Sequence, residues 1–225
     1  MIPPLIIQQA VEQGIGLIAI TDHNSSSNAK SVMIAASGSG VHVLPGVELQ
    51  TREEIHSICL FDSIEQCEAF QQIVDNALPD LKNNVDVLGE QYVVDPTGDF
   101  IREEDRLLIV STSLTLETAH QHVRALGGVL IPAHVNRAAY GLLPVLGFFP
   151  PTIDFPFVEI SASGNIEKIV QLYPQLSKYT LIIGGDAHSL DGVLGLNSFT
   201  IEKPCVAEII KAARMIDGRN LKLLV

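Results

Sequence analysis

Histidine, aspartate and glutamate residues occur where short apolar runs of this sequence end. These residues are Asp22, His23, Glu48, His56, His134, Asp186 and His188. A single histidine beside a strand is usually a surface residue, and Asp22 alone would be interpreted as a helix cap. Five such clusters in one chain make coincidence a poor explanation, so we expect the side chains to converge. Neutral imidazoles mixed with carboxylates form the ligand set that Zn, Mn and Fe prefer.

Alternating strands and helices must position these side chains. Apolar runs predict strands at residues 17–20, 41–44, 56–61, 129–131, 157–161, 181–188 and 221–225. Amphipathic segments predict helices at residues 4–13, 27–37, 64–78, 116–126 and 205–214. Strands separated by helices indicate βα units and a parallel sheet, and this number of strands favours a barrel. In such barrels the catalytic residues lie at the carboxyl ends of the strands, so we expect the clusters on one rim.

Residues 82–110 depart from this alternation. They are expected to form a hairpin whose turn is Asp95-Pro96-Thr97-Gly98, a sequence rich in turn-forming residues. The length of 225 residues agrees with one domain, because domains average about 150 residues. We therefore expect a single domain over residues 1–225, with the segment at 82–110 as an excursion from it.

The composition limits the classes of function. Hydrophobic residues make up 47% of the chain and charged residues 18%, which excludes intrinsic disorder. The 14 basic residues are outnumbered by 26 acidic ones and no basic stripe is visible, so we expect no extended nucleic-acid surface. The 3 cysteines form no CxxC motif, so a disulfide framework is not expected. No run predicts a membrane span or a secretory signal, which favours a cytoplasmic protein that does not bind a membrane.

Four segments resemble the motifs of the PHP (polymerase and histidinol phosphatase) family, whose members are metal-dependent phosphoesterases. They are ITDHN at 20–24, PGVEL at 45–49 with a histidine eight residues after its glutamate, IPAHV at 131–135 and GGDAHS at 184–189. Together they cover almost the whole chain in the order of the family. The resemblance implies a distorted (β/α)7 TIM-like barrel of the PHP type. It also implies up to three divalent metal ions on the rim at the carboxyl ends of the strands.

The resemblance also implies roles for individual residues. The positions that match metal ligands of the family are His23, Glu48, His56, His134, Asp186 and His188. In the family pattern the glutamate bridges two metals, and Glu48 takes this place. His56 and His134 complete one of the two bridged sites, and Asp186 serves the other. The site formed by Glu48, His56 and His134 keeps its protein ligands, so at least one metal ion is expected here.

The remaining candidates lie around these ligands. His23 and His188 are implied to share a third metal. Asp22 matches no ligand of the family, and we expect it to orient one of them. Arg137, three residues after a ligand, is a candidate for contacting a substrate phosphate, and so is Arg102 if the excursion folds over the rim. An ordinary surface arginine is the alternative for both.

One motif of the family does not occur in these residues. The family begins with a strand that ends in His-x-His, whereas residues 1–22 contain no histidine. We therefore expect a barrel without its first strand, whose two neighbouring strands would expose edges that favour oligomers. A start assigned too late, an artificially shortened chain and a decayed gene are the alternative explanations.

The expected function follows from the resemblance. It implies a phosphoesterase in which a metal-activated water molecule hydrolyses a small phosphorylated substrate or a short nucleotide. A metal-binding remnant with little or no turnover is the alternative, because the first motif is missing. A hydrolase of C–N bonds is a third hypothesis, since such enzymes use similar His/Asp rims. They also expect a lysine at the site, and no lysine follows a predicted strand.

Overall fold

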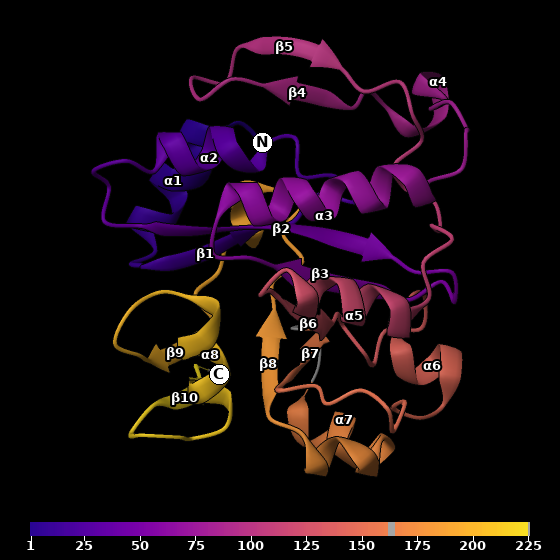
Figure 1. The fold of residues 1–225 in the computed structure, drawn as a ribbon. Coiled ribbons are helices and arrows are strands. Elements are labelled where there is room, and N and C mark those ends of the chain that lie inside the picture. The colour runs from indigo at the N-terminus through magenta and orange to yellow at the C-terminus, as the bar shows by residue number, and fades with distance from the viewer. Residues whose placement is uncertain (162–164, 225) are drawn as a thin grey trace.

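The computed structural model describes residues 1–161 and 165–224, and its architecture is α/β. The largest sheet has 4 strands in the order β1-β2-β3-β6, which can be followed in Figure 1. These strands are β1 (Leu17–Ile20), β2 (His42–Gln50), β3 (His56–Leu60) and β6 (Val129–Pro132). The helices connected to them are α1 (Pro3–Glu12), α2 (Ala29–Ala35), α3 (Ile64–Ala77) and α5 (Leu116–Ala125).

Three pairs of strands and several short helices complete the described structure. The pairs are β7 (Val158–Ser161) parallel to β8 (Leu181–Gly184), β9 (Asn197–Thr200) antiparallel to β10 (Asn220–Leu223), and β4 (Tyr92–Val94) antiparallel to β5 (Phe100–Glu103). The helices are α4 (Val85–Leu88), α6 (Leu142–Leu146), α7 (Ile166–Leu172), α8 (Val206–Ala213) and the 3-10 helices η1 (Pro174–Lys178) and η2 (Leu190–Gly192). Among the described residues, none of the helices has the length and apolar character needed to cross a bilayer.

The local sequence explains how several elements begin and what they bury. The hydroxyl of Ser63 accepts a hydrogen bond from the amide of Gln66, whose side chain accepts one from the Ser63 amide, so a capping box starts α3. Pro3 lies in the first turn of α1, where a helix does not need its N–H. β2 is buried on both faces, because Val43 packs with α1 and α2 while Leu44 packs with a second apolar cluster.

The predicted alternation of helices and strands is confirmed, but the strand arrangement differs from the expected barrel. The described strands form four separate sheets and do not close into a (β/α)7 TIM-like barrel. β2 is antiparallel to β3, and β3 to β6, although parallel neighbours were expected. The reason is the short connection at residues 51–55, which reverses the chain directly between β2 and β3. Only antiparallel neighbours can be joined by so few residues.

The candidate ligand Glu48 lies within a strand rather than beyond it, whereas His56 begins a strand, as expected. The apolar run at 41–44 was expected to be a complete strand, yet β2 continues through Glu48 to Gln50. The cause is the ladder with β3, in which Gln50 is paired with His56. The last predicted strand corresponds to β10, and its final residue, Val225, lies outside the described residues.

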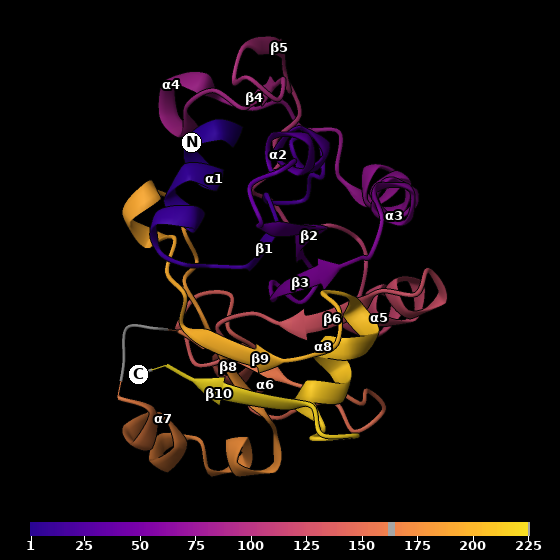
Figure 2. The same cartoon turned by 90° about the vertical axis from the view of Figure 1, so that its left-hand side faces the viewer.

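The excursion at residues 82–110 contains α4 and the predicted hairpin of β4 and β5. Figure 1 shows this hairpin at one end of the molecule, beyond α2 and α3 and opposite α7, and Figure 2 shows the same arrangement from the side. Its attachment is polar: the side chain of Asn28 accepts from the amide of Val94 and donates to the carbonyl of Tyr92. The hydroxyl of Ser31 donates to the carbonyl of Val94. The start of α2 therefore holds the hairpin in place.

Apolar packing joins β7 and β8 to the main sheet without a hydrogen-bonded ladder. One buried cluster includes side chains from β2, β6 and β8 and the residue before β7, namely Leu44, Ile131, Ile182 and Phe157. A cavity of about 1320 Å³ lies against this cluster. The candidate ligands on its wall are His23, Glu48, Asp186 and His188. The fold thus places the predicted chemistry at a large cavity next to an aliphatic core.

Candidate metal centre

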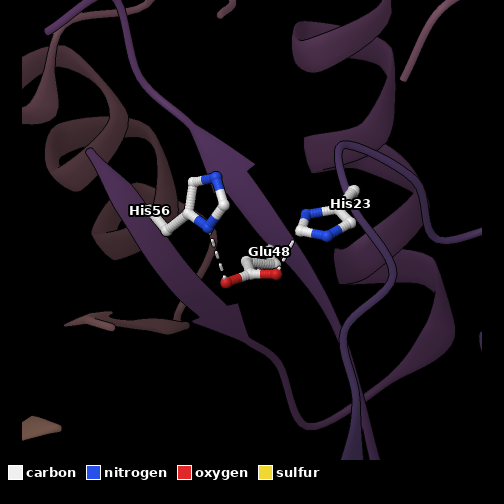
Figure 3. Close-up of side chains that lie close together, drawn as sticks. All are labelled: His23, Glu48 and His56. Carbon is white, nitrogen blue, oxygen red and sulfur yellow. Dashed lines mark ion pairs between the residues drawn. The ribbon is translucent and has the colours of Figure 1, made fainter. Parts of the chain in front are cut away.

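A carboxylate surrounded by imidazoles is the main feature of the site. Figure 3 shows Glu48 of β2 between two histidines. Its Oε2 is 3.0 Å from Nδ1 of His23, and its Oε1 is 3.1 Å from Nδ1 of His56. A third imidazole approaches the same side, with Nε2 of His134 3.4 Å from Oε1 of Glu48. The structure therefore brings four of the six predicted ligands together, three imidazoles around the carboxylate of Glu48.

The main sheet supplies all of these side chains. His23 follows β1 and forms an isolated parallel bridge with Glu48, which continues the ladder between β1 and β2. His56 is the first residue of β3, and His134 follows the end of β6. The φ angle of His134 is +30°, a left-handed value that residues other than glycine rarely adopt. Such strain is found mainly at functional sites, where the surrounding structure compensates for it.

Asn24 fixes the turn that carries His23, and sequence reasoning did not identify it. It is fully buried, with a φ of +47°, and its amide donates to a carbonyl of β2. Its side-chain oxygen accepts from the amide of Gln50, and its side-chain nitrogen donates to the carbonyls of Leu108 and Val110. One asparagine thus joins β1, β2 and the segment after the hairpin. The signal in the sequence was its place directly after the histidine.

The electrostatics of the cluster favour a charged glutamate. Burial by itself raises the pKa of Glu48, but the close contacts of its carboxylate with the imidazoles of His134, His23 and His56 outweigh it and hold that pKa well below its usual range. The hydrogen bond with Glu48 raises the pKa of His23, although burial acts in the opposite direction. The centre therefore presents a buried anionic carboxylate to nitrogen atoms.

Several of these nitrogen atoms lack hydrogen-bond partners. Within residues 1–161 and 165–224, the buried Nδ1 of His56 and both ring nitrogens of His134 make no aligned hydrogen bond, although Nδ1 of His56 and Nε2 of His134 lie close to Glu48. Buried polar atoms without partners are rare in folded proteins, because each one loses its hydration without compensation. One ligand atom from each of His23, Glu48 and His56 lies within 4.8 Å of the others. Two imidazoles and a carboxylate at this spacing fit a divalent cation, which would use the free nitrogen lone pairs.

Asp186 and His188 lie beside this centre rather than within it. The rings of His188 and His23 have centroids 5.8 Å apart. Nδ1 of His188 is 2.8 Å from the backbone carbonyl of Asp186, and the His188 side chain is 66% exposed. Asp186 has a φ of +43° and forms an ion pair with Arg137. These two predicted ligands therefore extend the polar wall of the cavity beyond the buried centre.

The remaining predicted site residues are an aspartate and two arginines. Asp22 accepts a hydrogen bond from the side chain of Asn28, and its carbonyl accepts from the amide of Glu48. Arg137 reaches the edge of the site through its ion pair with Asp186. Arg102, on β5, is bonded instead to Glu104 and Ser27. Ser27 and Glu104 line the same cavity as the candidate ligands, whereas Arg102 itself is not part of the cavity wall.

Glu159 is a second residue that sequence reasoning missed. It is buried on β7, and its Oε1 accepts a hydrogen bond from the amide of His134 at 3.1 Å. Burial raises the pKa of Glu159 to about 7, and the carboxylates of Glu48 and Asp186 act in the same direction. A Cβ atom on Gly184 would lie 2.1 Å from its carboxyl carbon, so only glycine leaves room for it. The signal was an acidic residue inside an otherwise apolar predicted strand.

Comparisons with known proteins identify the fold. No family model matches the chain. An uncharacterized protein from Streptococcus pneumoniae is 23% identical over 83 residues, which are 33% of this chain and 32% of that protein. The lesion-specific endonuclease Q from Pyrococcus furiosus is 18% identical, with a TM-score of 0.66 over 97% of this chain and 52% of that one. A second structure shows endonuclease Q bound to a 27-mer duplex substrate with an abasic lesion at the active site. It is 18% identical to this chain, with a TM-score of 0.70, and the match covers 96% of this chain and 52% of that one.

A shorter neighbour has a similar architecture. A proposed metal-dependent phosphoesterase from Bifidobacterium adolescentis has a TM-score of 0.54 at 16% identity, over 84% of this chain and 82% of that one. The chain spans about half the length of the endonuclease chains that it matches.

These findings overturn one expectation from composition. We expected no extended nucleic-acid surface, and that exclusion is wrong, because endonuclease Q has this fold and acts on duplex DNA. The physical reason is that a net charge of −12 averages over the whole chain, whereas binding depends on the local potential and on bound cations. What the chain shares with endonuclease Q and with the phosphoesterase is the α/β fold that carries the candidate metal centre.

Proposed function

We propose that this chain is a metal-dependent hydrolase of phosphoester bonds, with Glu48 at the centre of its metal site. The observation that carries the proposal is the buried carboxylate faced by three imidazoles, of which His56 and His134 have buried ring nitrogens that make no aligned hydrogen bond among the described residues. The fold supports it, because an endonuclease and a proposed phosphoesterase share this architecture. The four motifs that resemble the PHP family support the same reaction.

The residues of the buried centre have separable roles in this proposal. Glu48 and His56 would hold the cation together with His23 or His134, or with both. A bound divalent cation lowers the pKa of a water ligand and offsets the negative charge of a phosphate. Glu48 supplies the negative charge that attracts the cation, and the imidazoles supply neutral nitrogen ligands. Zn, Mn and Fe suit this mixture of donors.

The wall of the cavity would complete the site. Asp186 and His188 are proposed as further ligands, since they lie next to His23. Arg137 is proposed to contact the phosphate, which requires that it exchange its ion pair with Asp186 for one with the substrate. Asp22 is proposed to orient the turn of His23, because its carbonyl and side chain are both hydrogen-bonded there.

The test is hydrolysis by the purified chain with added Mn²⁺. The substrates are a phosphomonoester and a phosphodiester of p-nitrophenol and a DNA duplex with an abasic site, which separate small substrates from nucleic acid. Activity that Glu48→Gln abolishes and that Glu208→Gln retains would support the proposal. Glu208 is the matched control, since it is also a buried glutamate but lies in an ion-pair network on α8.

A metal-binding domain without turnover is the competing function. It predicts that Mn²⁺ binds in a Glu48-dependent manner while none of the three substrates is hydrolysed. That combination would overturn the proposed activity but leave the metal centre intact. Failure of Mn²⁺, Zn²⁺ and Fe²⁺ to bind would overturn both.

A further inference from the structure

Tyr140 makes two separate contacts with His56. Its ring lies parallel to the His56 ring, with 4.4 Å between the centroids and 2° between the planes. Its carbonyl accepts a hydrogen bond of 3.0 Å from the amide of His56. One residue thus fixes both the backbone and the ring of a candidate ligand. Neither contact was visible in the sequence, where the two residues are far apart.

The turn that carries Tyr140 is strained. Tyr140 has a φ of +61°, a left-handed value that is unfavourable for a bulky aromatic residue. A Cβ atom on the following residue, Gly141, would lie 2.2 Å from the carbonyl oxygen of Arg137, so the turn closes only with glycine there. Leu142 and Leu143 are buried directly after it and anchor the turn. Strain of this kind persists only where the surrounding structure imposes it.

The position of the ring explains what the strain achieves. His56 is buried, and its Nδ1 lies 3.1 Å from Oε1 of Glu48, a contact at one ring atom that by itself does not fix the plane of the ring. Tyr140 as a whole residue remains 37% exposed, so its ring covers the His56 ring from the surface side without being part of the core. Stacking on Tyr140 therefore supplies the second restraint, which fixes the plane of the His56 ring beside the carboxylate.

We propose that Tyr140 is a positioning residue of the metal centre, which orients the His56 ring for the cation through the stacked contact. This inference rests on the proposed metal centre at Glu48. Parallel aromatic contacts contribute about 0.5–1.5 kcal/mol, and loss of a contact that orients a ligand typically lowers metal affinity about 10-fold or more. Tyr140 touches neither the cation nor the substrate in this proposal.

The experiment compares metal affinity in three variants by titration calorimetry with Zn²⁺ and Mn²⁺. Tyr140→Phe keeps the stacked ring and should bind as the unaltered chain does. Tyr140→Gly removes the ring, so it should weaken metal binding about 10-fold. Glycine also tolerates the left-handed backbone at this position, so the thermal midpoint of the metal-free chain should stay the same or rise. Tyr92→Ala is the matched control, because Tyr92 is 46% exposed and makes one ring contact, with Phe100 on the hairpin.

The outcomes separate the two proposals. Unaltered metal affinity in Tyr140→Gly would overturn the positioning role while leaving the metal centre in place. Equal losses in Tyr140→Phe and Tyr140→Gly would also overturn it, since the hydroxyl rather than the stacked ring would then matter. Absence of metal binding by the unaltered chain would instead overturn the proposed centre itself.

Discussion

Two buried glutamates lie in opposite chemical environments in this molecule. Glu48 and Glu208 are 7% and 4% exposed, respectively. The carboxylate of Glu208 accepts hydrogen bonds from the guanidinium of Arg219, the ammonium of Lys211 and the amide of Glu202. Glu48 is surrounded by imidazoles instead, and buried ring nitrogens of His56 and His134 make no aligned hydrogen bond among the described residues.

This difference in hydrogen-bond partners indicates which buried carboxylate is available to bind a ligand. A guanidinium or ammonium group only donates hydrogen bonds, so it neutralises a carboxylate but offers no lone pair to a metal. The hydrogen bonds from Arg219, followed by those from Glu202 and Lys211, lower the pKa of Glu208 to about 2. That network joins α8 to Arg219, the residue before β10, and it already pairs the carboxylate of Glu208 with two cationic side chains. An imidazole can offer a lone pair where a cation takes the place of its proton, so we propose that a cation completes the Glu48 centre.

The largest expected effect is a metal-dependent gain in stability that only one of the two glutamates controls. A cation at about 100 times its dissociation constant stabilises the folded chain by about 2.7 kcal/mol. Glu48→Gln should abolish the increase in thermal midpoint that Zn²⁺ or Mn²⁺ produces, and Glu208→Gln should preserve it. Differential scanning fluorimetry with and without a chelator measures both. An equal increase in the two variants would remove the distinction between the regions.

A smaller effect is expected from packing beside the Glu48 centre. Gly184→Ala places a Cβ atom against the carboxyl group of Glu159, and overpacking of this kind costs about 1–3 kcal/mol. Gly16→Ala is the control, because nothing lies within 4 Å of the Cβ position of Gly16. Urea denaturation should show a lower free energy of unfolding for Gly184→Ala alone. Similar stability in both variants would mean that Glu159 does not need its present place.

The smallest effect is a pH dependence that belongs to the Glu208 network. Because the pKa of Glu208 falls from 4.5 to about 2 on folding, its contribution to stability is present above pH 4.5 and is lost as the pH falls toward 2. Glu208→Gln should flatten the decline of the thermal midpoint in that window. The exposed Glu12 provides the control variant, Glu12→Gln, which should keep the decline. A decline of the same size in Glu208→Gln would assign the acid sensitivity to other groups.

The candidate ligands could be identified from the sequence because their signal is local. Each one lies beside an apolar run, and residue type alone separates imidazoles and carboxylates from the strands that carry them. The helices at 64–77 and 116–125 and the hairpin in the excursion were predictable for the same reason. Periodicity, caps and turn residues all act within a few positions along the chain.

Contacts between distant segments were decided only by the tertiary structure. The antiparallel placement of β3 and the open arrangement of the sheets depend on strand pairing, which local periodicity does not encode. Asn24 contacts a residue 86 positions away, and Tyr140 and Glu159 support histidines that belong to other elements or loops. The sequence by itself thus determined which side chains are candidates for the chemistry. The packing of distant elements decided which of them meet, because the free energy of a contact depends on the neighbours that bury it.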